Sequence, residues 1–408
     1  MDIILPQNIS AIISIINSNG HEAYLVGGCV RDIIMGREPE DWDIATSATT
    51  DIIKSIFNKT FDTGLKHGTV TVLYGDAKAE VTTYRKEAAY SDHRRPDFVI
   101  PTNSLTEDLS RRDFTINSMA YHPDQGLRDP FNGLEDIKNR IIRCVGDPFK
   151  RFSEDALRML RAVRFSAQLG FDIEKNTLNA INEAAPTLAY VSMERIQTEI
   201  NKILISPLPE KLALLWETRL SKTIFPEISQ LDEDWCKYVR YFTRHKSRKN
   251  VLLTLLFITS FGDNAANCAR VILRRLKYDN ATIREVSRLI ESINSWGTLS
   301  DRNLRKAVSE YGYEITEDTI AIIEVMKNPD ETGDAGDNSK YLNLQNKVKP
   351  LKLAVSGLDL NKYLLINGSD INEMLTLLRL CVYEKPEINI PDVLLSIAQK
   401  IKDSNVKK

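Results

Sequence analysis

The chain has 408 residues, a formal net charge of −2, and a composition that is 42% hydrophobic and 27% charged, as in an ordinary globular protein. Its length predicts two to four domains, and its near-zero charge gives no global sign of nucleic-acid binding. No apolar window approaches the length of a membrane span, and the N-terminus lacks the pattern of a signal peptide. Five scattered cysteines without CxxC or zinc-type spacing indicate reduced thiols, so we expect a cytoplasmic protein.

The first third of the chain mixes helix and strand patterns. Apolar spacing predicts a helix over residues 6–18 and a strand over 23–26, which ends at a pair of glycines. Two β-rich runs, 69–74 and 79–84, flank a Gly-Asp pair, which is a strong hairpin signal. These patterns predict an α+β head in which helices pack on a small mixed sheet.

Strand patterns nearly vanish after residue 147, and helical periodicity takes over. The segment Ser153-Glu154-Asp155 is a helix-capping signal that precedes a strongly periodic run. The helix predicted for this run is expected to end at Gly170. Further helices are predicted over 174–184, 192–204, 208–215, 235–244, 251–260, 265–276, 283–296, 302–310, 370–383 and 390–402. An acidic stretch at 330–339 predicts a linker. We therefore expect an all-α neck, body and tail behind the head, with the boundaries head 1–146, neck 147–215, body 216–329 and tail 330–408.

Two aspartates, Asp41 and Asp43, are separated by one residue, so in an extended segment they project from the same face. Carboxylates this close repel each other unless a cation lies between them, and paired hard oxygen ligands suit Mg²⁺. Gly27 and Gly28 end the preceding strand, where backbone N–H groups can approach a phosphate. Each feature alone has an ordinary alternative, a solvated acidic loop or a simple turn. Together they predict a site for phosphoryl or nucleotidyl transfer.

Three motifs extend this pattern: LVGGCVRDIIMGREPEDWDIAT at 25–46, RRD at 111–113 and EDALR at 154–158. The set resembles the signature of the DNA polymerase β-like nucleotidyltransferase superfamily. More narrowly, it resembles the bacterial-type (class II) tRNA nucleotidyltransferases and the related bacterial poly(A) polymerases. The resemblance covers the head and neck, and it is weaker in the body and tail.

The resemblance implies roles for several head residues. Asp41 and Asp43 would be the catalytic carboxylates and would hold Mg²⁺. Gly28 and Arg31 would contact the triphosphate, and Arg112 would contact the incoming nucleotide through its guanidinium group.

Two further features of the head have open interpretations. Glu80 lies on a strand expected beside the Asp43 strand, either as a third catalytic carboxylate or as a salt-bridged strand residue. The charged segment around Asp92, Arg94 and Arg95 resembles the flexible loop that the family needs to move from adding C to adding A. An ordinary surface loop is the alternative reading of that segment.

The EDALR motif is the sharpest of the set. On a helix, Asp155 and Arg158 would be three residues apart and share a face, which Arg161 and Arg164 continue. One carboxylate acceptor and one guanidinium donor in fixed geometry can pair with the Watson–Crick edge of cytosine or adenine. Guanine and uracil would leave polar groups unpaired and be rejected. A helix held by ordinary ion pairs is the alternative for EDxxR alone.

The resemblance thus implies an enzyme that transfers CMP and AMP from CTP and ATP to a tRNA 3′ end, with the helical domains binding tRNA. An A-adding specialist and a poly(A) polymerase are alternatives within the family. A catalytically silent RNA-binding protein is the alternative from another class, and the complete motif set argues against it. A small-molecule nucleotidyltransferase would not need the long helical extension.

Overall fold

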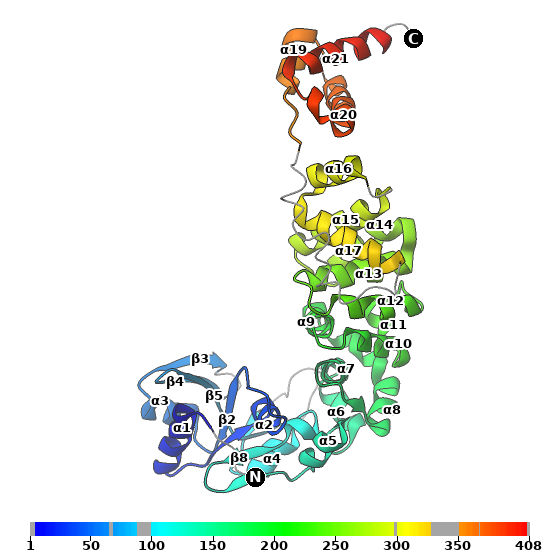
Figure 1. Cartoon of the computed structure of the whole chain (residues 1–408). Helices are drawn as coiled ribbons and strands as arrows, with labels where there is room; N and C mark the ends of the chain where they lie inside the picture. Colours follow the sequence, from blue (N-terminus) through cyan, green and yellow to red (C-terminus); the bar gives the residue numbers. More distant parts are fainter. Residues whose placement is uncertain are drawn as a thin grey trace. The chain divides into compact units, whose positions relative to one another are not determined.

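The computed structural model describes residues 5–64, 68–87, 99–297, 300–327, 351–366 and 368–405. These form two compact units, Met1–Gln230 and Leu231–Lys408 (Figure 1). The predicted head and neck lie in the first unit, while the four-domain division stays a prediction. The loop residues Asp92, Arg94 and Arg95 and the predicted linker at 330–339 lie outside the described residues.

A seven-stranded mixed sheet forms the head, with strand order β3-β4-β5-β2-β1-β8-β9. Its strands are β1 Ala23–Val26, β2 Trp42–Thr46, β3 Thr60–Gly64, β4 Thr69–Tyr74, β5 Ala77–Thr83, β8 Ala120–His122 and β9 Gly126–Arg128. Strands β2 and β5 are parallel and the other described neighbours are antiparallel. A separate two-stranded ribbon joins β6 Arg85–Glu87 to β7 Val99–Pro101. The predicted strand at 23–26 and the hairpin around the Gly-Asp pair are confirmed.

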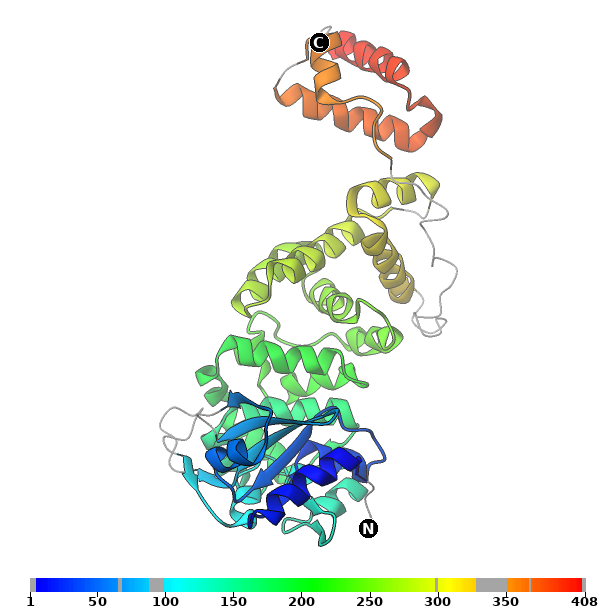
Figure 2. The same cartoon turned by 90° about the vertical axis from the view of Figure 1, so that its left-hand side faces the viewer.

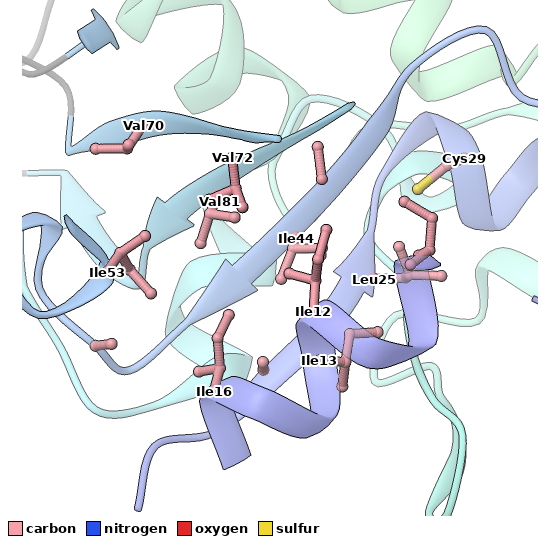
Figure 3. Packing of buried hydrophobic residues seen from close by; sticks show 14 of the residues in the cluster. Ile12, Ile13, Ile16, Leu25, Cys29, Ile44, Ile53, Val70, Val72 and Val81 are labelled. Carbon is pink, nitrogen blue, oxygen red and sulfur yellow. The ribbon is translucent and has the colours of Figure 1, made fainter. Parts of the chain in front are cut away.

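Alternation along the strands builds the head core on both faces of the sheet. On β1, Leu25 points into the larger cluster beneath α1 (Gln7–Ser18), whereas Tyr24 and Val26 join a smaller cluster on the other face. Ile12, Ile16 and their neighbours on α1 are fully buried against the strands, as Figure 3 shows. Figure 2 shows α1 lying across the sheet. This packing fixes the strands that carry the acidic residues of β2 and β5.

Short helices connect the strands, namely α2 Gly28–Ile34, α3 Thr50–Ile56, α4 Leu105–Ser110 and α5 Gly133–Asn139. The rest of the first unit is helical apart from a short parallel pair, β10 Ile141–Ile142 with β11 Asp172–Ile173. Its helices are α6 Pro148–Glu154, α7 Leu157–Leu169, α8 Lys175–Ala184, α9 Met193–Leu204, α10 Leu214–Glu217 and α11 Ser221–Ile224. Helix α7 packs along α9 and ends at Gly170, which has the left-handed φ of 71° expected of a helix stop.

Gly133 is required where α5 meets the Thr115–Asn117 turn. A Cβ at Gly133 would lie 2.3 Å from the backbone oxygen of Thr115, and neither backbone segment can yield easily. We expect Gly133→Ala to lower the free energy of unfolding by about 3 kcal/mol or more, in the range of severe overpacking. Gly126→Ala is the matched control, since its φ is +72° but its Cβ would meet open space. It should cost about 1 kcal/mol. Urea unfolding measures both, and equal losses would contradict the prediction.

The second unit is all-helical in its described residues. Its helices are α12 Glu233–Tyr238, α13 Arg248–Phe261, α14 Ala265–Arg275, α15 Asn280–Asn294, α16 Asp301–Tyr311, α17 Tyr313–Lys327, α19 Gly357–Leu364, α20 Ser369–Glu384 and α21 Pro391–Asn405. Helix α15 packs against α13, α14 and α17, and a separate apolar cluster holds α19, α20 and α21 together. The sequence predicted most of these helices but not α17 or α19.

One helical run in the described part of the chain, Arg248–Arg275, is long and apolar enough to cross a membrane by length and composition alone. This corrects the expectation that no such window exists. The residues of Val251–Phe257 are all buried in the second unit, and 44% of the apolar window is buried. Because the core helix of a soluble protein passes the same test, the run is weak evidence for a membrane span.

Asp318 on α17 is a buried carboxylate whose Oδ1 lies 3.4 Å from His245 Nε2. Its pKa is raised from 3.8 to about 7, mainly by burial and to a smaller extent by the charges of Glu285 and Glu317, against a hydrogen bond from Ser247 and the charge of Lys246. The folded protein thus keeps a proton that an unfolded chain releases. The native state therefore loses stability as pH rises through this range.

Replacement of Asp318 by asparagine should remove this pH-dependent cost. We expect the stability gain of Asp318→Asn to be about 2 kcal/mol larger at pH 8 than at pH 5. Urea unfolding at the two pH values measures it. Glu314→Gln, an exposed change on the same helix, should show no such difference. A gain independent of pH would contradict the assignment.

Candidate active site

The paired aspartates lie at the start of β2, beside β5. Asp41 directly precedes the strand and is exposed, while Asp43 is its second residue. In the parallel pairing of β2 with β5, Asp43 is level with Glu80. The pKa of Asp43 is raised to about 6, mainly by burial and to a smaller extent by the charges of Glu80 and Asp41, against the opposing guanidinium of Arg112. This strand end is therefore a place where added positive charge is favourable.

Glu80 stays a candidate rather than an established member of the site. It is exposed, and its charge acts on Asp43, but it does not line the cavity described below. Among the described residues, no group of three or more His, Cys, Asp or Glu side chains is placed to hold a metal ion. A cation at Asp41 and Asp43 would need further oxygen ligands from water or a bound phosphate, which is the coordination Mg²⁺ usually has in proteins.

Gly27 lets the backbone approach these acids closely. Its φ of 79° lies in the region that favours glycine. A Cβ there would lie 2.8 Å from Arg112 Nη1 and 3.7 Å from Asp43 Oδ2. Gly28, the glycine predicted to contact the triphosphate, is the first residue of α2. The turn from β1 into α2 thus brings backbone, Arg112 and Asp43 together.

An open cavity of about 560 Å³ joins this strand end to α7 and α9. Its described lining comprises Gly27, Gly28, Arg31, Asp41, Asp43, Arg111, Arg112, Asp113, Asn117, Asp155, Leu157, Arg158, Arg161, Arg164, Phe165, Arg195 and Lys202. Cationic side chains in this lining outnumber carboxylates two to one. The excess of positive charge suits a strongly anionic ligand.

The two head arginines predicted to bind nucleotide are held by acidic or amide partners. Arg31 donates to Asn117 Oδ1 at 2.7 Å and, through Nε and Nη2, to both oxygens of Asp32 at 2.9 Å. Arg112 Nη2 lies 3.3 Å from the buried carboxylate of Asp108. The guanidinium groups therefore reach the cavity from fixed positions.

The arginines of α7 each pair with a different acid. Arg158 Nη1 donates to Glu154 Oε2 at 2.6 Å. Arg161 Nε donates to Asp113 Oδ2 at 2.7 Å; although burial opposes ionisation of Asp113, this ion pair outweighs it and lowers the pKa of that carboxyl. These pairs fix the positions of the guanidinium groups before any ligand is present.

Arg164 is the most buried of the three arginines on α7, and it faces an acid on α9. Its Nη1 lies 3.1 Å from Glu199 Oε2, and both side chains are almost fully buried. Burial, and next the charge of Arg161, lower its pKa to about 10. The surrounding structure therefore holds the guanidinium of Arg164 close to that of Arg161 although the two like charges repel each other.

The expectation that Asp155 and Arg158 share one helix face is wrong. Asp155 is extended, with φ −143° and ψ 104°, at the end of α6, and α7 begins at Leu157. Its Oδ1 accepts a hydrogen bond from Leu157 N at 3.0 Å, and Arg195 Nη2 donates to its Oδ2 at 2.8 Å. The acid is thus oriented by α9 and not by helical spacing, yet both residues still line the same cavity.

Several lining residues were not predicted as site residues. Arg195 and Lys202 on α9 are seven residues apart, which places them on one face of the helix and could have indicated a shared role. Asn117 lies four residues after the RRD motif. Its side-chain amide donates a hydrogen bond to Asp113 Oδ1 and accepts one from Arg31 Nη1. Phe165 carried no polar signal at all.

Two protein-family models match parts of this chain. Residues 23–143 match the family model of the Poly A polymerase head domain, and residues 170–231 match the model of a probable RNA and SrmB-binding site of polymerase A. Fold and family model thus define a nucleotidyltransferase with a poly(A)-polymerase type of head.

Relatives that match almost the whole chain identify the family more specifically. The CCA-adding enzyme of Geobacillus sp. (strain WCH70) is 40% identical over 92% of each chain, and that of Lactobacillus helveticus (strain DPC 4571) is 37% identical over 94% of each. The crystal structure of the Bacillus stearothermophilus CCA-adding enzyme in complex with CTP has a TM-score of 0.77 at 31% identity, covering 99% of this chain and all of that one. The chain belongs to the family of CCA-adding enzymes, and membership implies a need for a divalent metal ion.

Proposed function

We propose that this protein adds CMP and AMP from CTP and ATP to the 3′ end of tRNA without a nucleic-acid template. One observation carries the proposal: a single cavity is lined by the carboxylates of Asp41 and Asp43 and also by the carboxylate of Asp155 and the guanidinium of Arg158. Paired carboxylates serve nucleotidyl transfer, and an acid–arginine pair serves base recognition. A protein that only bound RNA would need neither in this arrangement.

The chemistry is a displacement at the α-phosphorus. The 3′-oxygen of the tRNA forms a bond to that phosphorus, its proton is lost, and the bond to the β,γ-pyrophosphate breaks. We assign Asp41 and Asp43 to hold Mg²⁺, and the proximity of Glu80 to Asp43 makes it the third catalytic candidate. Bound Mg²⁺ supplies Lewis-acid activation of the 3′-hydroxyl and charge stabilisation of the leaving pyrophosphate.

The cationic lining would hold the triphosphate. Gly28 and Arg31 approach it from the first turn of α2, and Arg112 approaches from the RRD segment. Because their guanidinium groups are already fixed by acids and amides, little ordering is needed when a nucleotide binds. Arg161 and Arg164 extend the positive surface along α7.

Base choice would depend on Asp155 and Arg158. The carboxylate accepts from the exocyclic amine of cytosine or adenine, while the guanidinium donates to a ring acceptor. Guanine and uracil present a carbonyl where the acid lies, so a buried polar group would be left unpaired. Two amino-acid side chains then replace a template.

We assign tRNA in the cytoplasm as the macromolecular substrate. The helical second unit would bind its acceptor stem and elbow by shape complementarity and by contacts to backbone phosphates. The family model over 170–231, described as a probable RNA-binding site, supports an RNA partner for the neck. The loop around Asp92, Arg94 and Arg95 would take part in moving from C to A addition.

Incorporation of labelled nucleotides tests the proposal. The substrates are tRNA transcripts that end at the discriminator base, after one C and after CC, each with CTP, ATP or both in the presence of Mg²⁺. We expect all three to be extended to CCA and then to stop. Extension of the CC-ended transcript alone would identify an A-adding specialist, and a long A tail a poly(A) polymerase. No incorporation into any transcript would overturn the proposed activity.

A further inference from the structure

Phe165 lies where three arginines of the cavity meet. The guanidinium carbons of Arg31, Arg161 and Arg164 lie over its ring, at 5.3, 5.4 and 4.2 Å from the centroid. Phe165 is itself 6% exposed, and it is the one aromatic side chain among the described residues that line the cavity. An arrangement with three cations around one ring is more than core packing requires.

The ring sits between cations that come from different parts of the chain. Arg31 belongs to α2 of the head, whereas Arg161 and Arg164 belong to α7. Each guanidinium has a polar partner of its own, Asn117, Asp113 or Glu199 respectively. Those partners leave the cations close together, where they repel each other.

An aromatic face reduces this repulsion. Its quadrupole places negative potential above the ring, which attracts guanidinium groups within about 6 Å of the centroid, and more strongly where water is excluded. The ring is held in place by Phe114, which meets it edge-on at 5.8 Å and 84°. Phe165 is thus a fixed surface against which arginines from the head and from α7 are ordered together.

We propose that Phe165 is a positioning residue for nucleotide binding: its ring holds Arg31, Arg161 and Arg164 in the arrangement that receives the triphosphate. The inference rests on the proposed function, since it names how the same cavity accepts a nucleoside triphosphate. The ring touches no reacting atom. Its effect should therefore appear in nucleotide affinity, as a change in KM, with little change in kcat.

Fluorination of the ring separates this role from simple packing. Phenylalanine analogues with one, two and five fluorine atoms lose the negative potential of the face stepwise while nearly keeping the ring's shape. Installed at position 165 of the full-length protein, they should raise the KM for CTP and ATP progressively, to about ten-fold for the pentafluoro ring, with kcat changed less than two-fold. Phe165→Leu should match the pentafluoro protein, while Phe165→Tyr should stay near the parent.

Phe57 is the matched control. It is also buried and meets an aromatic neighbour edge-on, Tyr74 at 6.4 Å and 80°, but it lies in the head core and outside the cavity lining. The same analogues at position 57 should leave KM unchanged, and thermal unfolding of both series should stay alike. A flat KM along the 165 series, or an equal rise in both series, would overturn the inference.

Titration of CTP into the same proteins makes the two proposals separable. If the parent protein binds CTP but incorporates nothing, the proposed function fails while the fluorine series in affinity still decides the role of Phe165. If the parent extends tRNA normally and affinity does not follow fluorination at position 165, only the role of Phe165 fails.

Discussion

Asp43→Asn is expected to abolish nucleotide transfer, by at least about a thousand-fold in kcat, while the protein stays folded. The change removes one carboxylate of the pair that would hold Mg²⁺, and charge stabilisation of this kind is worth several kcal/mol in the transition state. Since Asp43 is partly buried, removal of its charge relieves the burial cost and the repulsion from Glu80 and Asp41, which together outweigh the lost attraction to Arg112. We therefore expect an inactive variant that is as stable as the parent, or more so.

Single-turnover incorporation of CMP into a tRNA transcript, with thermal unfolding alongside, measures the effect. Asp124→Asn is the control, because Asp124 is a highly exposed acid of the same head and lies outside the cavity lining. It should retain full activity. Asp41→Asn should behave like Asp43→Asn, and Glu80→Gln decides whether the third carboxylate takes part. Normal turnover of the Asp43 variant would overturn the metal assignment.

Local sequence rules predicted the head well because its strands follow them closely. The strand at 23–26 alternates between the two core faces, and the Gly-Asp pair connects β4 to β5 in register. What those rules could not provide was the parallel pairing that sets Asp43 level with Glu80. That contact joins segments almost forty residues apart and depends on how the whole sheet is ordered.

The sequence also could not show which of the many charged side chains form ion pairs with one another. Arg158 has acids three and four residues before it, and both spacings fit a helix. The chain instead leaves helical geometry at Asp155, so Arg158 pairs with Glu154 and Asp155 turns to Arg195, forty residues later. Helix α6, with seven residues, is too short for a periodicity argument to detect.

Helix α17 was missed for a different reason. Its buried residues include Thr316, Asp318 and Thr319, so polar side chains interrupt the apolar pattern on the inward face. Periodicity identifies helices whose buried face is apolar, so it does not detect a helix that has polar residues on its buried face. Phe165 is the converse case: its apolar side chain carries no sequence signal of a site, and only the structure shows three guanidinium groups around it.

Loss of Asp155 or Arg158 is expected to relax base choice more than it slows transfer. In Asp155→Ala the acceptor for the exocyclic amine is gone, and in Arg158→Ala the donor to the ring is gone. A site built on paired hydrogen bonds rejects a wrong base because its own polar groups would remain unsatisfied, which is worth about 10⁴-fold or more in selectivity. We expect CTP and ATP to lose about 10² of their preference over UTP and GTP in either variant.

Competition among the four nucleotides on one tRNA transcript, read by sequencing the added residues, measures this preference directly. Glu194→Ala is the control, since Glu194 is exposed on α9 beside Arg195 and does not line the cavity. Arg195→Ala adds a graded test: because Arg195 orients Asp155, its loss should relax selection in the same direction but less completely. Unchanged selectivity in both the Asp155 and the Arg158 variants would place base recognition elsewhere in the cavity. Relaxation in only one would assign the discrimination to that side chain, since the acid reads the exocyclic group and the arginine reads the ring.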